Sequence, residues 1–171
     1  MEIHDYEKLW LGLALLLIVG FIATVAYGAV GAGVAMVDDE GGTVDPNALD
    51  QHPKFSDPGV YESGDGEYDV YVIARQYMFQ PGTQEPIEVP ANSTVTFHVT
   101  SADVIHGFEV VGTNANTMAI PGEVATITVE VSSPGKYGLL CNEYCGGGHH
   151  GMEGTLRVVP RTEFNGTEVS G

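Results

Sequence analysis

The stretch "KYGLLCNEYCGGGHHGMEGTLRVV", residues 136–159, contains two short apolar runs on either side of a loop with unusual chemistry. The runs 136–140 and 154–159 are typical of β-strands, because they are short, apolar and bounded by turn residues. The loop 141–152 between them holds both cysteines of the chain, together with two histidines and a methionine. The stretch therefore predicts two strands joined by a loop that carries the function.

Four similar runs precede this stretch and extend the strand pattern along the chain. They are rich in β-branched and aromatic residues, mostly alternate apolar with polar positions, and cover 68–73, 93–99, 107–111 and 124–131. Gly, Pro and Asn punctuate the gaps, and no long helical pattern follows Val37. Strands at this spacing predict one all-β sandwich or barrel domain over residues 67–160.

An apolar segment precedes the domain. No charged residue occurs from Leu9 to Val37, whereas a membrane-spanning helix needs only about 20 apolar residues. A cleaved signal peptide would have an apolar region of only about 7–15 residues behind a basic start, and the tail 1–8 is acidic instead. We therefore predict one uncleaved transmembrane helix within 9–37. Lys8 is the only basic residue near it, which favours an N-terminus inside and a domain outside.

Two further segments are predicted to lie outside the helix and the strands. Residues 38–66 are rich in Gly, Pro and Asp, which predicts a linker lying over the surface. Residues 161–171 are polar and terminal, which predicts a frayed tail.

The charge balance is strongly acidic, with 23 Asp and Glu against 6 Lys and Arg, a net charge of −17. Such a surface repels nucleic acid and excludes that class of partner. Self-repulsion of a single-sign surface is screened at high salt. We therefore expect a halophilic source.

The loop 141–152 favours a metal site over a disulfide. Two cysteines in an outward-facing domain suggest a disulfide by default, and their spacing does not forbid one. However, His149 and Met152 follow Cys141 and Cys145 within the same loop. Thiolate, imidazole and thioether together form a soft ligand set that suits copper, whereas zinc prefers four Cys or His ligands.

The number of cysteines favours two copper ions. A single blue copper uses one Cys, two His and a weak axial ligand, which leaves one thiol unused. Two thiolates can instead bridge two ions, each completed by one histidine and one weak ligand. Met152 suits one weak position, and the backbone carbonyl of Glu143 suits the other. An electron shared by two metals changes each bond little.

The second histidine must come from another part of the chain. His106 lies at a turn between two predicted strands and can project into a site at one end of the domain. His98 lies within a strand, so we expect it to face solvent or a polar gap. His149 and His150 are adjacent and point apart, so one of them should be a ligand, and spacing alone leaves the choice open.

These residues resemble a known family. The pattern C-x-E-x-C-G-x-x-H-x-x-M, from Cys141 to Met152, resembles the dinuclear copper A motif of cytochrome c oxidase subunit II. The segment "DVIHGF", 103–108, resembles the family's upstream segment that carries the first histidine ligand. A single predicted helix, and Trp10 as the only tryptophan, resemble the short subunit II of B-type haem-copper oxidases.

The resemblance implies a cupredoxin-like Greek-key β-barrel and a role for each residue of the motif. The side-chain ligands would be His106, Cys141, Cys145, His149 and Met152. Glu143 would bind through its carbonyl, and its carboxylate would reach a magnesium ion at the interface with the catalytic subunit. Asp103 would hold the ligand loop by hydrogen bonds. Many members receive electrons at a tryptophan-rich stretch; here Tyr77, Met78 and Phe79 are the candidates, unless they are core residues.

The implied function is electron entry into a terminal haem-copper oxidase at the outer face of a prokaryotic plasma membrane. The donor would be a soluble cytochrome c or a small blue-copper protein, and haem in catalytic subunit I would receive the electron for dioxygen reduction. Two alternatives are a copper A subunit of a nitric oxide reductase and a membrane-tethered copper-delivery protein. A quinol oxidase subunit is disfavoured, since such subunits lack the copper cysteines.

Overall fold

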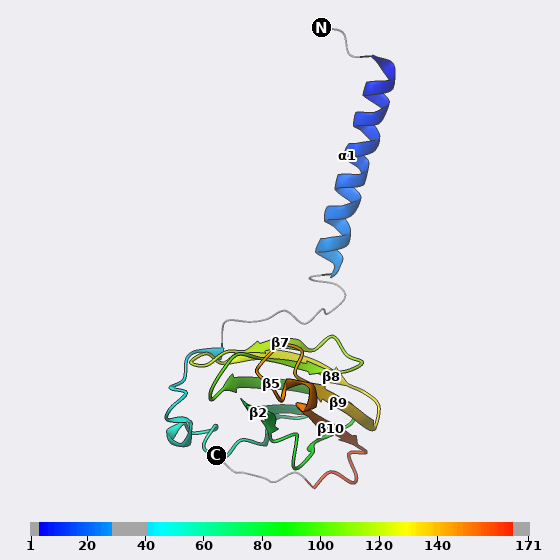
Figure 1. The fold of residues 1–171 in the computed structure, drawn as a ribbon. Coiled ribbons are helices and arrows are strands. Elements are labelled where there is room, and N and C mark those ends of the chain that lie inside the picture. The colour runs from blue at the N-terminus through cyan, green and yellow to red at the C-terminus, as the bar shows by residue number, and fades with distance from the viewer. Residues whose placement is uncertain (1–3, 29–40, 166–171) are drawn as a thin grey trace. The chain divides into compact units, whose positions relative to one another are not determined.

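The computed structural model describes residues 4–28 and 41–165, which fall into two compact units, 1–36 and 37–171. The first unit holds the N-terminal helix and the second holds the strands (Figure 1).

Helix α1 (Asp5–Ala26) begins at a capping box. The side chain of His4 accepts a hydrogen bond from the backbone N–H of Tyr6, and the Glu7 carboxylate accepts one from the N–H of His4. The cap explains why the helix starts four residues before Leu9. Its 22 residues span about 33 Å, enough for a hydrocarbon core of about 30 Å. It is the one described helix long and apolar enough to cross a membrane, and residues 29–37 of the predicted span lie outside the described residues.

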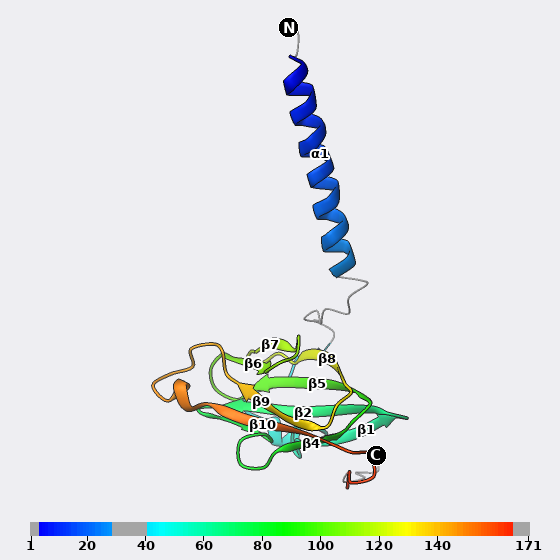
Figure 2. The same cartoon turned by 90° about the vertical axis from the view of Figure 1, so that its right-hand side faces the viewer.

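The domain consists of two β-sheets (Figures 1 and 2). The first contains β1 (Val60–Gly64), β2 (Glu67–Arg75), β3 (Met78–Gln80), β5 (Ser93–Ser101) and β8 (Ala125–Val131). The second contains β4 (Ile87–Pro90), β10 (Glu153–Val159), β9 (Gly135–Leu140), β6 (His106–Val110) and β7 (Asn116–Ala119). Two short 3₁₀ helices complete the described elements, η3 (Leu49–Gln51) and η4 (His149–Gly151).

Apolar side chains fill the space between the sheets. The pairs β2–β5 and β4–β10 are parallel and the other paired strands are antiparallel. Phe97 on β5 and Phe108 on β6 are fully buried, with ring centroids 5.3 Å apart across the core. This architecture, one N-terminal apolar helix followed by a two-sheet cupredoxin-like domain, confirms the predicted fold class.

The topology gathers the functional segments at one end of the domain. Because β2 and β5 are parallel, their C-terminal ends lie at the same edge, where Gln76 and Asp103 follow them. Strand β6 starts at this end and β9 finishes there. The loop after β9 projects from this end (orange in Figure 2).

Residues 41–59, here termed the strap, pack onto the first sheet. The N–H of Val44 donates to the carbonyl of Gly122 at 3.1 Å. Leu49 and Phe55 are buried against Ile73 and Val124, where they form a small apolar cluster. The sequence predicts a surface linker here; the described part of it adds core to the domain. Two apolar residues scattered among Gly, Pro and Asp provide no periodic signal that would reveal this.

We predict that Phe55→Ala lowers the free energy of unfolding of the copper-free chain by about 3 kcal/mol, as expected when a buried aromatic ring is lost. Phe55 is only 2% exposed and packs edge-on against Tyr71 at 5.3 Å between ring centroids. Denaturant unfolding measures the change. The matched control is Asp50→Ala, an exposed site on the same segment, which should change stability by less than about 0.5 kcal/mol. Equal effects from the two variants would contradict a cooperative role for the strap.

Candidate copper centre

Five soft donor side chains come from four places in the second sheet and its loops. His106 is the first residue of β6, Cys141 directly follows β9, and Met152 directly precedes β10. Cys145 and His149 lie in the loop between, and His149 opens η4. His106 is completely buried, both cysteines and Met152 are buried, and His149 is half-buried. The sheet therefore presents the donors to one another in a nearly dry site.

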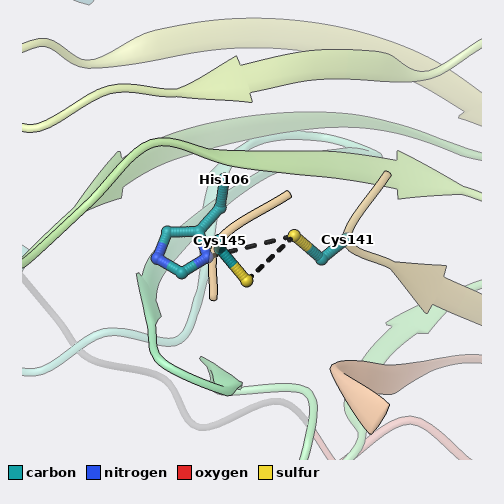
Figure 3. Close-up of side chains that lie close together, drawn as sticks. All are labelled: His106, Cys141 and Cys145. Atoms are coloured by element: carbon teal, nitrogen blue, oxygen red, sulfur yellow. Dashed lines mark hydrogen bonds between the residues drawn. The ribbon is translucent and has the colours of Figure 1, made fainter. Parts of the chain in front are cut away.

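Each of the other donor atoms lies within 4 Å of one of the two cysteine sulfurs. The Sγ atoms of Cys141 and Cys145 are 3.8 Å apart. His106 Nδ1 lies 3.9 Å from Cys141 Sγ, and His149 Nδ1 lies 3.7 Å from Cys145 Sγ. Met152 Sδ is 3.7 Å from Cys145 Sγ. Figure 3 shows His106, Cys141 and Cys145 converging on one point.

The sulfur separation excludes a disulfide and fits a metal. Both cysteines are free, and 3.8 Å is far beyond a disulfide bond of about 2.05 Å. A metal–thiolate bond is about 2.3 Å, so one ion can contact both sulfurs at this separation. His106, Cys141 and Cys145 are also the one group of described His, Cys and acidic residues whose ligand atoms come close enough to hold an ion.

Burial of the two thiols disfavours their charged form. Burial, with the neighbouring Cys141 thiol as a second cause, raises the pKa of the Cys145 thiol to about 11. Thiolates in this site therefore require a cation, and binding one releases protons. The site combines two sulfurs, two imidazoles and a thioether, which suits copper better than zinc. These residues form the ligand cluster of a copper A centre.

Asp103 fixes the orientation of His106. The Nε2–H of His106 donates to Asp103 Oδ1 at 2.8 Å. This bond places the proton on Nε2, so Nδ1 keeps its lone pair and faces Cys141. A carboxylate behind a ligand imidazole also raises the basicity of the ligand.

Asp103 is in turn held by backbone N–H groups. Burial alone would raise the pKa of its carboxyl, but the hydrogen bonds from the His106 ring and from the N–H groups of Gln76 and Val104 hold that pKa below its ordinary value. The carboxylate is therefore ionised at neutral pH and ready to accept from His106. Asp103 thus connects the His106 ring to the backbone at Gln76 and Val104.

Gln76 is a contributor that sequence reasoning missed. Its backbone N–H donates to Asp103 Oδ2 at 2.8 Å, and its side-chain amide donates to the carbonyl of Cys145. One residue thus ties the segment after β2 to both the His106 support and the cysteine loop. A lone Gln after a strand has no motif, so only the three-dimensional arrangement reveals it.

The three candidates for electron entry occupy different environments. Phe79 is 1% exposed and packs edge-on against Phe108 in the core, with ring centroids 5.4 Å apart. Met78 is half-buried. Tyr77 is partly exposed, and its ring lies so close to Gly148 that a Cβ there would come within 2.8 Å of the ring. Of the three, only Tyr77 combines exposure with contact to the copper loop.

Glu143 presents its backbone to the site and its side chain to solvent. Its carbonyl oxygen accepts from Cys141 Sγ at 3.1 Å, so it lies beside one of the two thiols. Its side chain is exposed, and the residues able to hold an ion do not include it. The structure therefore gives no support to magnesium at Glu143.

Two other histidines that the sequence brought forward, His150 and His98, lie outside the cluster. His150 is exposed, so the structure brings His149 to the cysteines and resolves the ambiguity of the adjacent pair. His98 donates to Asp69 Oδ1 at 3.1 Å and stacks on Tyr71. Its side chain is 19% exposed, so it occupies a half-buried polar environment on the first sheet.

Comparisons with known proteins agree with this geometry. A family model described as cytochrome C oxidase subunit II, periplasmic domain, matches residues 60–159. A cytochrome c oxidase subunit 2 of Thermus thermophilus is 43% identical over 157 residues, covering 90% of this chain and 91% of that protein. A second Thermus thermophilus subunit 2 is 45% identical over 117 residues, covering 67% and 84% respectively.

Solved structures agree as well. A chain of a haem-copper terminal oxidase dimer, determined by cryo-electron microscopy, has a TM-score of 0.73 at 34% identity, covering 91% of this chain and 100% of that one. The periplasmic domain of subunit II of a Bradyrhizobium japonicum cytochrome oxidase has a TM-score of 0.52 at 24% identity, covering 56% and 86%, which supports the fold alone.

We predict that Asp103→Asn weakens copper binding by about 10- to 100-fold, because His106 loses the carboxylate that fixes its tautomer and raises its basicity. Competition with a copper chelator measures the affinity. The matched control is Asp69→Asn, which removes the carboxylate partner of His98 away from the cluster and should leave copper affinity unchanged. Similar losses in both variants would mean that Asp103 acts through general stability.

Proposed function

The chain belongs to the cytochrome c oxidase subunit II family, and from this premise we propose that it receives electrons one at a time from a small soluble donor. The donor class is a cytochrome c or a small blue-copper protein, and the recipient is haem in the catalytic subunit, which reduces dioxygen. The observation that carries the proposal is the pair of free, buried thiols 3.8 Å apart, each within 4 Å of a histidine Nδ1.

The chain's own residues hold this site ready for electron transfer. When bound, dinuclear copper supplies one-electron redox chemistry. His106, both cysteines and Met152 exclude water by their burial, and Asp103 and Gln76 hold the surrounding backbone in place. Side chains fixed in this way need little rearrangement when charge arrives or leaves. The Glu143 carbonyl is proposed as a further weak ligand, supported by its 3.1 Å contact with Cys141 Sγ.

The surface beside the site favours an apolar contact with the donor. Val104 and Ile105, directly before the ligand His106, are exposed, as are Tyr77 and Tyr144. The Tyr144 ring also packs edge-on against the ligand His149, with centroids 5.8 Å apart. We term Tyr77, Val104, Ile105 and Tyr144 the docking patch. An apolar patch of this kind retains its attraction at high salt, whereas charge steering is screened within a few ångströms.

The setting that we propose follows from the anchor and the charge. Helix α1 anchors the chain in the membrane, and Lys8 at its start supports a domain on the outer face of a prokaryotic plasma membrane. A net charge of −17 supports a halophilic source, in which salt screens the self-repulsion.

The two alternative functions have less support. A copper-delivery protein needs an exchangeable, accessible ion, whereas four of the five donors here are buried. A nitric oxide reductase subunit would use the same copper motif, but two relatives that span about nine-tenths of this chain belong to oxidases.

The function is tested by Cys141→Ser in the assembled oxidase. We expect the variant to copurify with the catalytic subunit but to lose oxygen consumption driven by the soluble donor, because one of the two thiolates is gone. A small chemical reductant that reduces the haems directly should still sustain oxygen consumption. Persistence of the donor-driven reaction would contradict electron entry through this site.

The docking patch is tested separately, by the rate of electron transfer from the donor. Ile105→Ser should slow electron transfer from the donor by about tenfold, since burying an isoleucine stabilises a contact by about 1.5 kcal/mol. The slowing should persist at high salt. The matched control is Val111→Ser. Val111 is 39% exposed, against 45% for Ile105, but it follows the last residue of β6, whereas His106 is the first. Stopped-flow reduction measures both rates, and equal slowing would contradict the proposed patch.

A further inference from the structure

Asn142 lies across the start of β6, next to two ligands of the copper centre. It directly follows Cys141, and Gly107, which directly follows His106, lies beneath it. The pairing of β6 with β9 includes Glu109 opposite Leu140, and continuing this register by two residues places Asn142 opposite Gly107. The two ligand backbones therefore run side by side at this point.

Gly107 makes this close approach possible. A Cβ added at Gly107 would overlap the side-chain amide oxygen of Asn142 and come within 2.9 Å of its backbone nitrogen. No other residue type fits unless Asn142 moves away. The glycine thus lets the Cys141 end of the copper loop lie directly on the strand that begins with His106.

The amide of Asn142 is bonded to the neighbouring strands. Its Nδ2 donates to Glu109 Oε2 at 3.3 Å and to Asn116 Oδ1 at 3.1 Å. Glu109 and Asn116 are themselves paired across β6 and β7. The Asn142 side chain therefore links the copper loop, directly after Cys141, to β6 and to β7.

The other support residues act elsewhere in the site. Asp103 holds the far side of the His106 ring, and Gln76 holds the carbonyl of Cys145. The backbone N–H of Cys141 donates to the Met152 carbonyl at 3.3 Å, which ties Cys141 to the end of its own loop. Among these contacts, the Asn142 amide is the one that ties the Cys141 end of the loop to β6.

We propose that Asn142 is a positioning residue of the copper centre, which sets the separation between the Cys141 thiolate and the His106 imidazole. This inference rests on the proposed function of the site. The hydrogen bonds are exposed and add little to global stability, so their contribution is to the geometry offered to the metal. Loss of the amide should therefore loosen copper without unfolding the protein.

The test uses the full chain loaded with copper. Asn142→Ala should release copper into excess chelator about tenfold faster than the unmodified chain, the lower end of the range for residues that support metal ligands. Its paramagnetic resonance spectrum should also show altered copper hyperfine splitting. The thermal midpoint of the copper-free variant should match that of the unmodified chain. Gly107→Ala should reproduce the faster release, because its Cβ displaces the same amide.

Two matched variants isolate the geometry. Glu109→Gln keeps an oxygen acceptor for the Asn142 amide and should release copper at the rate of the unmodified chain. Asn47 lies in the strap, and its exposed amide also donates to a carboxylate, Asp45 Oδ1, at 3.3 Å. Asn47→Ala should leave the rate of copper release unchanged.

The inference would be overturned if Asn142→Ala released copper at the rate of the unmodified chain. It would also be overturned if the faster release came with a lower thermal midpoint of the copper-free variant. A failure of the proposed function is a different outcome, since the unmodified chain would then lack the spectrum of an electron shared by two coppers.

Discussion

Two buried thiols held 3.8 Å apart without a bond between them are the constraint on which the rest of the structure depends. They are too far apart for a disulfide, and burial works against a charged thiolate, so their placement makes sense only around a cation. His106, His149 and Met152 approach the same two sulfurs. The double sheet supplies this arrangement by ending β9 and starting β6 and β10 at one end of the domain.

Hydrogen bonds from three segments then hold the donors in place. Asp103 supports the His106 ring from the loop after β5, and Gln76 supports the cysteine loop from the end of β2. Asn142 links that loop to β6 and β7. Each tie is made by a residue outside the ligand set, and each restricts a different part of it. A site restrained from several directions changes little when an electron arrives, which suits transfer more than bond-making chemistry.

Much of this organisation could be predicted from the sequence, because the ligands lie in motifs with short spacing. Four of the five donor side chains lie in one loop, from Cys141 to Met152, and "DVIHGF" supplies the fifth, His106, with its partner Asp103. The choice of His149 over His150 could not be made from spacing, since it depends on how η4 turns. Gln76 was missed because its contacts are made across 27 and 69 residues of chain. The strap was interpreted as a linker because Leu49 and Phe55 have no periodic neighbours.

The central claim is that the two thiolates would hold two copper ions that share one electron. Its most direct test is the copper content of the loaded chain, recorded together with its electron paramagnetic resonance spectrum. The account predicts two coppers per chain and one unpaired electron whose hyperfine lines reveal coupling to both nuclei. A single copper with the hyperfine pattern of one nucleus, or an oxidised chain with Cys141 and Cys145 joined as a disulfide, would contradict it.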